Sequence, residues 1–161
     1  MDKNSLKRKR KQGYFFEKKM VSKFRKNCDL TYWTSDKRCG CIFAPHSEDP
    51  DLGMQLKGQP EHRFAIECKW HYLADTLDCI WVAANNTQLE RYRNYQKDNH
   101  IPVFIAVGLG EIGCDLQALY IIPLDEINNW EMMIKDIDQK YEFNIQKDLR
   151  YNPETKLIEE V

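Results

Sequence analysis

The sequence predicts a mixed α/β fold, in which helices flank a mixed β-sheet. A turn signal at Gly58, Gln59 and Pro60 lies between two stretches that can both run as strands, which predicts an antiparallel hairpin. Residues 101–107 form a continuous apolar run rich in branched side chains, as in a strand covered on both faces. A helical segment between the hairpin and this run predicts a right-handed βαβ crossover that joins parallel neighbours.

The chain is expected to fold as one domain preceded by a short tail. With 161 residues, of which 42% are hydrophobic and 12% aromatic, it can bury one good core. We assign residues 13–161 to this domain and residues 1–12 to a flexible basic tail, which carries six basic side chains and one acid. Such a tail is typically disordered and contacts phosphates, although a solubilising role or a nuclear localisation signal gives the same composition.

Composition also predicts a cytoplasmic protein. No apolar run is long enough to span a membrane, and the basic N-terminus lacks the apolar segment of a secretory signal. The cysteines are scattered rather than spaced as a disulfide framework, which fits a reducing compartment. Cys39, Cys41 and His46 lie close together in the sequence, but the paired spacing of zinc sites is missing, so zinc is not favoured there.

Residues 13–28 are predicted as a helix whose apolar stripe contains an acid. At about 100° per residue, one arc of this helix collects Met20, Val21, Phe24 and Cys28. Glu17 lies inside that arc. Because a buried carboxylate requires a partner or a metal, Glu17 is either a hydrogen-bonded core residue or part of a functional site.

The predicted hairpin brings two further carboxylates together. With Gln59 at the turn centre, antiparallel partners have numbers that sum to about twice 59, so Asp51 faces Glu67 with Cβ atoms roughly 5 Å apart. The alternation along the second strand places Lys69 on the same face. Asp49 competes with Asp51 for the site, because in this register it faces Lys69.

Two carboxylates held this close repel each other. A hard divalent cation bound by oxygen ligands relieves the repulsion, and Mg²⁺ is the natural candidate. The alternative is a cross-strand charge ladder, in which Lys69 neutralises Glu67 and Asp51. The residue pattern alone leaves both readings open.

A second helix is predicted over residues 87–98, because Thr87 and Glu90 form a capping box at its start. Further strands are expected at residues 31–34, 40–44 and 119–122. Past Pro123, helical spacing connects Trp130, Met133, Ile134 and Ile137. The segment after Lys140 is too polar and irregular to place.

One face of the 87–98 helix offers polar groups. Gln88 and Tyr92 are four residues apart and share this face, and Arg91 and Tyr95 extend it. Amide, phenol and guanidinium groups suit contacts with phosphates and bases. The alternative is an ordinary amphipathic helix in which Leu89 and Tyr92 pack and the rest is solvated.

Taken in order, these features resemble the PD-(D/E)XK nuclease superfamily, which includes type II restriction endonucleases, archaeal Holliday-junction resolvases and exonuclease domains of recombination helicases. The resemblance covers residues 13–122. It rests on Glu17 in the opening helix, Pro50-Asp51, Glu67-Cys68-Lys69 at the end of an apolar strand, and Gln88-Leu89-Glu90-Arg91-Tyr92. The last of these looks like the Gln-x-x-x-Tyr motif of the exonuclease and resolvase branches.

The resemblance implies a restriction-endonuclease-like fold and a role for each motif. Asp51, Glu67 and the backbone carbonyl of Cys68 would hold Mg²⁺, for which Mn²⁺ can substitute. Glu17 would reach the same ion through water or help to hold a second one. Lys69 would orient the attacking water and favour its ionised form.

The substrate contacts follow from the same resemblance. Gln88, Tyr92 and Arg91 would bind the substrate strand. The implied protein is a Mg²⁺-dependent deoxyribonuclease that binds DNA, in its narrower form a junction resolvase or a repair or phage-type nuclease, and a homodimer, since such enzymes act as symmetric pairs. The alternatives are a catalytically inactive nucleic-acid-binding module on the same fold, an enzyme acting on RNA and a protein-interaction domain.

Overall fold

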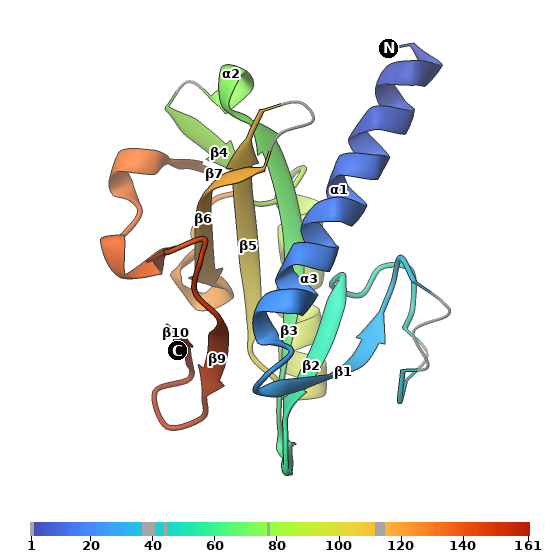
Figure 1. Cartoon of the computed structure of the whole chain (residues 1–161), viewed down its shortest axis with the longest axis vertical. Helices are drawn as coiled ribbons and strands as arrows, with labels where there is room; N and C mark the ends of the chain where they lie inside the picture. Colours follow the sequence, from blue (N-terminus) through green and yellow to red (C-terminus); the bar gives the residue numbers. More distant parts are fainter. Residues whose placement is uncertain (1, 37–40, 44, 77, 112–114) are drawn as a thin grey trace.

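A computed structural model describes residues 2–36, 41–43, 45–76, 78–111 and 115–161. Its centre is a six-stranded mixed sheet with the order β1-β2-β3-β5-β6-β8, which confirms the predicted fold class. The strands are β1 (Cys28–Trp33), β2 (Leu52–Leu56), β3 (Gln59–Tyr72), β5 (Val103–Gly110), β6 (Leu116–Pro123) and β8 (Glu142–Phe143). The long helix α1 (Lys3–Phe24) crosses one face of the sheet, and α3 (Asn86–Asn99) lies behind it on the other (Figure 1).

Smaller elements complete the chain. The helix α2 (Leu73–Thr76) follows β3, and two small sheets pair β4 (Cys79–Trp81) with β7 (Glu131–Met133) and β9 (Leu149–Asn152) with β10 (Leu157–Glu160). Short 3₁₀ turns occupy Leu124–Glu126, Ile134–Asp136 and Gln139–Tyr141. No helix in the described part of the chain is long and apolar enough to cross a membrane.

The hairpin of β2 and β3 has the predicted register. Leu52 pairs with Ile66 and Gly53 with Ala65, so the residue before β2 lies opposite Glu67. The turn depends on Gly58, whose φ of 73° is a left-handed conformation that glycine adopts at low cost. The register shifts only next to this turn, so the part of the hairpin that carries the acids is regular.

Strand β5 is the centre of the fold. It runs parallel to β3 and antiparallel to β6, and every one of its residues is buried, as predicted for a strand covered on both faces. A Cβ at Gly108 would lie 2.6 Å from a ring carbon of Phe16, so glycine there allows α1 to lie close to the sheet.

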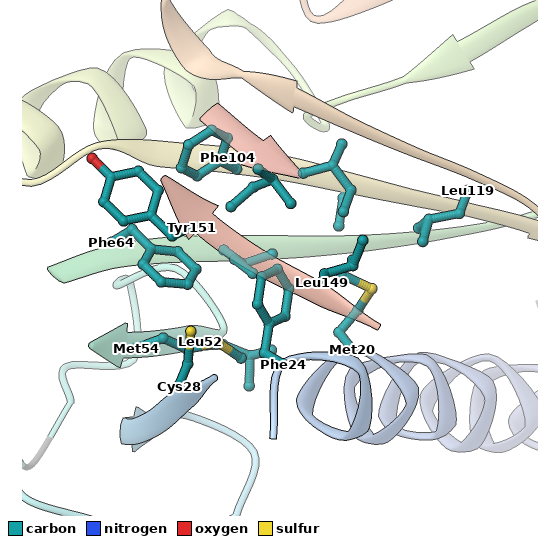
Figure 2. Packing of buried hydrophobic residues seen from close by; sticks show 14 of the residues in the cluster. Met20, Phe24, Cys28, Leu52, Met54, Phe64, Phe104, Leu119, Leu149 and Tyr151 are labelled. Atoms are coloured by element: carbon teal, nitrogen blue, oxygen red, sulfur yellow. The ribbon is translucent and has the colours of Figure 1, made fainter. Parts of the chain in front are cut away.

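The core has one layer on each face of the sheet. Beneath α1, Met20 and Phe24 pack toward Phe64 and Phe104, and Tyr151 of β9 enters the same layer (Figure 2). The ring of Tyr151 stacks on Phe64 with centroids 4.9 Å apart. On the other face, α3 contributes Leu89 and Tyr92 to a second layer with side chains of β5 and β6.

Helix α1 begins earlier than predicted. The basic segment 1–12 was expected to be a flexible tail, but the helix starts at Lys3, and the side chain of Asp2 accepts a hydrogen bond from the backbone N–H of Asn4 at its N-cap. Lys, Arg and Gln are good helix formers, so a capped run of them extends a helix that the core already holds. The helix ends at Phe24 rather than at Cys28, which is the first residue of β1.

Three other predictions differ from the structure. Residues 41–43, in the predicted strand 40–44, are not in a strand, and residues 40 and 44 lie outside the described residues. The helix expected over 130–137 is instead β7 followed by a 3₁₀ turn. The cysteines were expected to be reduced, but Cys41 is disulfide-bonded. Cys39 lies outside the described residues.

Candidate active site

Asp51 and Glu67 lie side by side at the point where β2 begins. The backbone N–H of Asp51 donates to Glu67 Oε2 at 3.2 Å, and the backbone N–H of Cys68 donates to Asp51 Oδ2 at 2.8 Å. These reciprocal bonds follow from the hairpin register, which puts residue 51 opposite residue 67. Asp49, the competing acid, instead accepts a bond from the backbone N–H of His46 at 2.9 Å.

Lys69 completes this face of β3. Its Nζ lies 2.7 Å from Glu67 Oε1, and both side chains are largely withdrawn from solvent. The same nitrogen lies 3.3 Å from Gln88 Oε1 and 3.3 Å from the hydroxyl of Tyr92. Three acceptors from two elements therefore surround one ammonium group.

Helix α3 supplies the other half of the cluster. Asn85 is its N-cap and accepts a bond from the backbone N–H of Gln88 at 2.9 Å, so the prediction of Thr87 as the cap is wrong. The capping places Gln88 at the start of the helix, where its side chain also accepts a bond from the backbone N–H of Ala84 at 2.7 Å. One turn later, the hydroxyl of Tyr92 donates to Glu67 Oε1 at 2.6 Å.

Glu17 approaches the cluster from α1. It is buried, and it accepts hydrogen bonds from the indole N–H of Trp33 at 2.6 Å and the hydroxyl of Ser35 at 3.1 Å. Both donors come from β1 and the residues after it, and neither was singled out from the sequence. The sequence offers only a general signal, which is that the N–H of a buried Trp needs an acceptor, and it does not say which acceptor.

The cluster carries more negative charge than its single lysine balances. Burial raises the pKa of Asp51 well above its ordinary value, and the charges of Glu67 and Glu17 raise it further, against the N–H of Cys68 and the charge of Lys69. Burial also raises the pKa of Glu17, which its two hydrogen bonds oppose and Glu67 reinforces. A cation between the acids would lower the electrostatic free energy of the folded state.

The donor set fits a hard divalent cation that shares its ligands with a substrate. Within the residues that the structure describes, no three His, Cys, Asp or Glu side chains stand in position to hold a metal together. Mg²⁺ usually keeps several waters and takes only one or two carboxylates with substrate phosphates, which is what Asp51 and Glu67 offer. Glu17 is held by Trp33 and Ser35 and stands behind this pair.

One side chain differs from its expected place, and another near the site was not expected there. Arg91, predicted to bind substrate beside Gln88, lies 3.0 Å from Glu48 and does not join the bonds around Lys69. Thr34, which the sequence did not suggest, lies with its hydroxyl 3.3 Å from the backbone carbonyl of Asp51. The geometry is also unlike a solvated charge ladder, because buried Glu67 receives bonds from both a lysine and a tyrosine.

Comparison with known proteins bears on the fold. The structure is similar to the 1.6 Å structure of Hjc from Archaeoglobus fulgidus, described as a Holliday junction resolvase from an archaeal hyperthermophile. The match has a TM-score of 0.51 and 16% sequence identity, and it covers 77% of this chain and 85% of that one. This chain has the restriction-endonuclease-like fold. No protein-family model matches the sequence, and neither does any curated protein.

Proposed function

We propose that this restriction-endonuclease-like protein is a divalent-metal-dependent deoxyribonuclease. The observation that carries the proposal is the convergence of Asp51, Glu67 and Lys69 with Gln88 and Tyr92 in one hydrogen-bonded cluster. Burying several charged groups together lowers stability, so a cluster of this kind is typical of a functional site. A Holliday junction resolvase has the same fold, which supports phosphodiester hydrolysis over the alternative functions considered from the sequence.

In this proposal each side chain has a distinct task. Asp51, Glu67 and the backbone carbonyl of Cys68 would hold Mg²⁺, or Mn²⁺ in its place, and Glu17 would add negative charge near them. The bound cation supplies Lewis acidity at the phosphate and lowers the pKa of the attacking water. Lys69 donates to that water or to a phosphate oxygen.

The distances around Lys69 suggest how it would exchange partners. Its contact with Glu67 is short, at 2.7 Å, whereas those with Gln88 and Tyr92 are long, at 3.3 Å. A water or a phosphate oxygen can therefore replace one of the long contacts while Glu67 keeps the ammonium in place. Gln88 and Tyr92 would then fix the position of the strand.

The narrower proposal is a structure-specific nuclease, such as a junction resolvase, that acts as a homodimer. Its support is the Hjc neighbour, which is a resolvase of the same fold. The basic first turns of α1, which reach past the sheet in Figure 1, would add contacts with phosphates.

Cleavage assays test the proposal. Labelled single-stranded, duplex and four-way-junction DNA would be incubated with the protein in Mg²⁺, Mn²⁺ or a chelator, beside Asp51→Asn and Glu67→Gln. Asp29→Asn is the matched control, because Asp29 is an exposed acid of β1. Metal-dependent cutting that only the two site variants abolish is expected. Binding of DNA by all four proteins with no cutting would instead support an inactive nucleic-acid-binding module.

A further inference from the structure

A pocket lies near the acid cluster, on the same two elements β3 and α3. It is a pocket of about 390 Å³ between β1, the loop before β2, β3 and the C-terminal half of α3. Its walls include Phe43, Asp49, Arg63, Tyr95 and Asn99. None of these residues takes part in the chemistry proposed above.

We propose that this pocket receives an unpaired nucleobase of the bound DNA strand, beside the phosphate that is cleaved. The proposal rests on the proposed nuclease function and narrows its substrate to DNA with an unpaired nucleotide near the cut. A base inside a duplex cannot enter such a pocket without leaving its stack, so the site favours strands that are already unpaired.

The position of the pocket follows from the same two elements that build the acid cluster. On α3, Tyr92 reaches Glu67, and Tyr95 and Asn99 lie three and seven residues further along the same helix face. At 1.5 Å per residue, Tyr95 is only about 4.5 Å beyond Tyr92 along the axis. A nucleotide next to the cleaved phosphate therefore lies within reach of the pocket.

Strand β3 runs from the acid cluster to the pocket in the same way. Arg63 and Glu67 are an even number of residues apart and project from the same face of the strand. The charge of Arg63 is felt by Tyr95, whose phenol also lies 3.0 Å from the hydroxyl of Tyr32. The paired phenols close the pocket on its inner side.

The aromatic wall suits stacking with a base. Phe43 is 45% exposed, so its side chain is open to solvent, and the guanidinium of Arg63 lies 5.3 Å from the centroid of its ring. The backbone N–H of Phe43 donates to the carbonyl of Thr31 at 2.9 Å, which ties this residue to β1. Aromatic and guanidinium faces are the surfaces on which proteins stack unpaired bases.

The charges of the pocket favour a base over a phosphate. The opposite charges of Asp49 and Arg63 balance each other on its walls, so these two groups supply no excess positive charge to draw in a phosphate. Asn99 offers both amide donor and acceptor atoms, and Asp49 offers acceptors. Such groups match the donor and acceptor pattern on the edge of an unpaired base.

The test combines side-chain removal with base removal. Cutting by the wild type in Mg²⁺ first maps the cut position on the preferred DNA. Binding is then measured in a chelator, on that DNA and on copies in which one nucleotide at a time near the cut is abasic. The variants are Phe43→Ala, Arg63→Gln and the restoring Phe43→Trp, with Ile42→Ala as the matched control, since Ile42 is the neighbouring residue and 60% exposed.

Phe43→Ala should weaken binding of intact DNA about tenfold, the usual loss for one stacked base. An abasic nucleotide at one position should weaken binding by the wild type as much as Phe43→Ala does. Phe43→Ala and the abasic nucleotide together should weaken binding no more than either change alone. Arg63→Gln should show the same pattern, and Ile42→Ala and Phe43→Trp should bind as the wild type.

Three results would overturn the proposal, and they differ in what they say about the nuclease function. Independent, additive losses at every abasic position, or no loss with Phe43→Ala, would reject the pocket while a cutting wild type keeps the nuclease function. A wild type that cuts no DNA would reject the nuclease function, and the pocket proposal would be rejected with it.

Discussion

At the residue scale, the central feature is the excess negative charge of the acid cluster. The buried acids Glu17 and Glu67 and the half-buried Asp51 share one lysine. The pKa of Asp51 is raised by burial, by Glu67 and by Glu17. A carboxyl group in this state lowers the stability of the metal-free protein, because it must either keep a proton or hold an unfavourable charge. A bound cation would remove this loss of stability.

Asp51→Asn is therefore expected to stabilise the metal-free protein at neutral and higher pH. The folded state of the wild type binds the Asp51 proton more tightly than the unfolded state, so its stability falls as pH rises above the ordinary value of about 4. Urea unfolding in a chelator should show the variant to be more stable at pH 8, with a gap that narrows as pH is lowered toward 4.

Added Mg²⁺ should distinguish the two proteins. It should stabilise the wild type and leave Asp51→Asn nearly unchanged, because the ion binds only the folded site. Asp29→Asn serves as the control and should follow the wild type. In the chelator, the free energies of unfolding of the wild type and Asp51→Asn should differ more at pH 8 than at pH 4. An equal difference at the two pH values would contradict this account of Asp51.

The residues of the site differ in how far the sequence predicts them. Asp51, Glu67 and Lys69 follow from one turn and the period of a strand, because the hairpin is local and its register is fixed by the turn. Trp33 and Ser35 hold Glu17 through contacts between separate elements, which no local pattern encodes. Arg91 shares the right helix yet contacts Glu48, since the end of a long side chain is set by its surroundings.

At the element scale, the start of α3 positions both Gln88 and Tyr92. Asn85→Ala removes the N-cap and should lower the free energy of unfolding by about 1 kcal/mol. Thr87→Ala is the matched control and should change it by less than about 0.5 kcal/mol, because Thr87 does not cap the helix. If chemical denaturation shows equal losses for Asn85→Ala and Thr87→Ala, the capping box that the sequence predicts would be supported instead.

Helix α1 presents a second element-scale test, this time of DNA binding. Lys7 and Arg10 lie on the helix face that continues to Tyr14, whose ring stacks on Trp33 beside the acid cluster with centroids 5.4 Å apart. Arg8 and Lys9 project from other faces. The first pair should therefore contact phosphates and the second should not.

The salt dependence of binding separates the two pairs. Lys7→Gln with Arg10→Gln should reduce the slope of log affinity against log salt concentration by about 1 to 2, since two phosphate contacts are lost. Arg8→Gln with Lys9→Gln removes the same charge and should change the slope by less than half as much. Equal slopes for the two double variants would show that only the net charge of the helix matters.

Elements were predictable where sequence signals are strong and local. The hairpin, β5 and the helix around Gln88 and Tyr92 have turn, apolar-run or capping signals. The segment 130–137 has helical spacing, but it forms β7 because its partner β4 lies about 50 residues earlier in the chain. Pairing over that distance cannot be read from a short window of sequence.

At the scale of the whole molecule, the C-terminal hairpin belongs to the same core as the site. Leu149 of β9 is fully buried, and it packs with Phe64 and Phe104 in the layer beneath α1 (Figure 2). Lys23 of α1 also donates to the carbonyls of Ile145 and Lys147. The polar segment after Lys140, which the sequence could not place, thus closes one face of the sheet.

Leu149→Ala should accordingly lower the free energy of unfolding by about 2 to 5 kcal/mol, as for other fully buried leucines. Leu6→Ala, an exposed leucine on the first turns of α1, should change it by less than about 0.5 kcal/mol. Urea denaturation followed by circular dichroism measures both. A small effect of Leu149→Ala would indicate that the hairpin is an appendage rather than part of the core.

The most direct test of the nuclease account is the rate at which bound DNA is cut by Lys69→Gln. With protein in excess over DNA and saturating Mg²⁺, cutting should slow by about 100-fold or more, while the dissociation constant for DNA stays within about twofold of the wild type. Lys57→Gln, a change in the turn of the same hairpin, should cut normally. If Lys69→Gln cuts as fast as the wild type, the cluster around Lys69 is not the catalytic site.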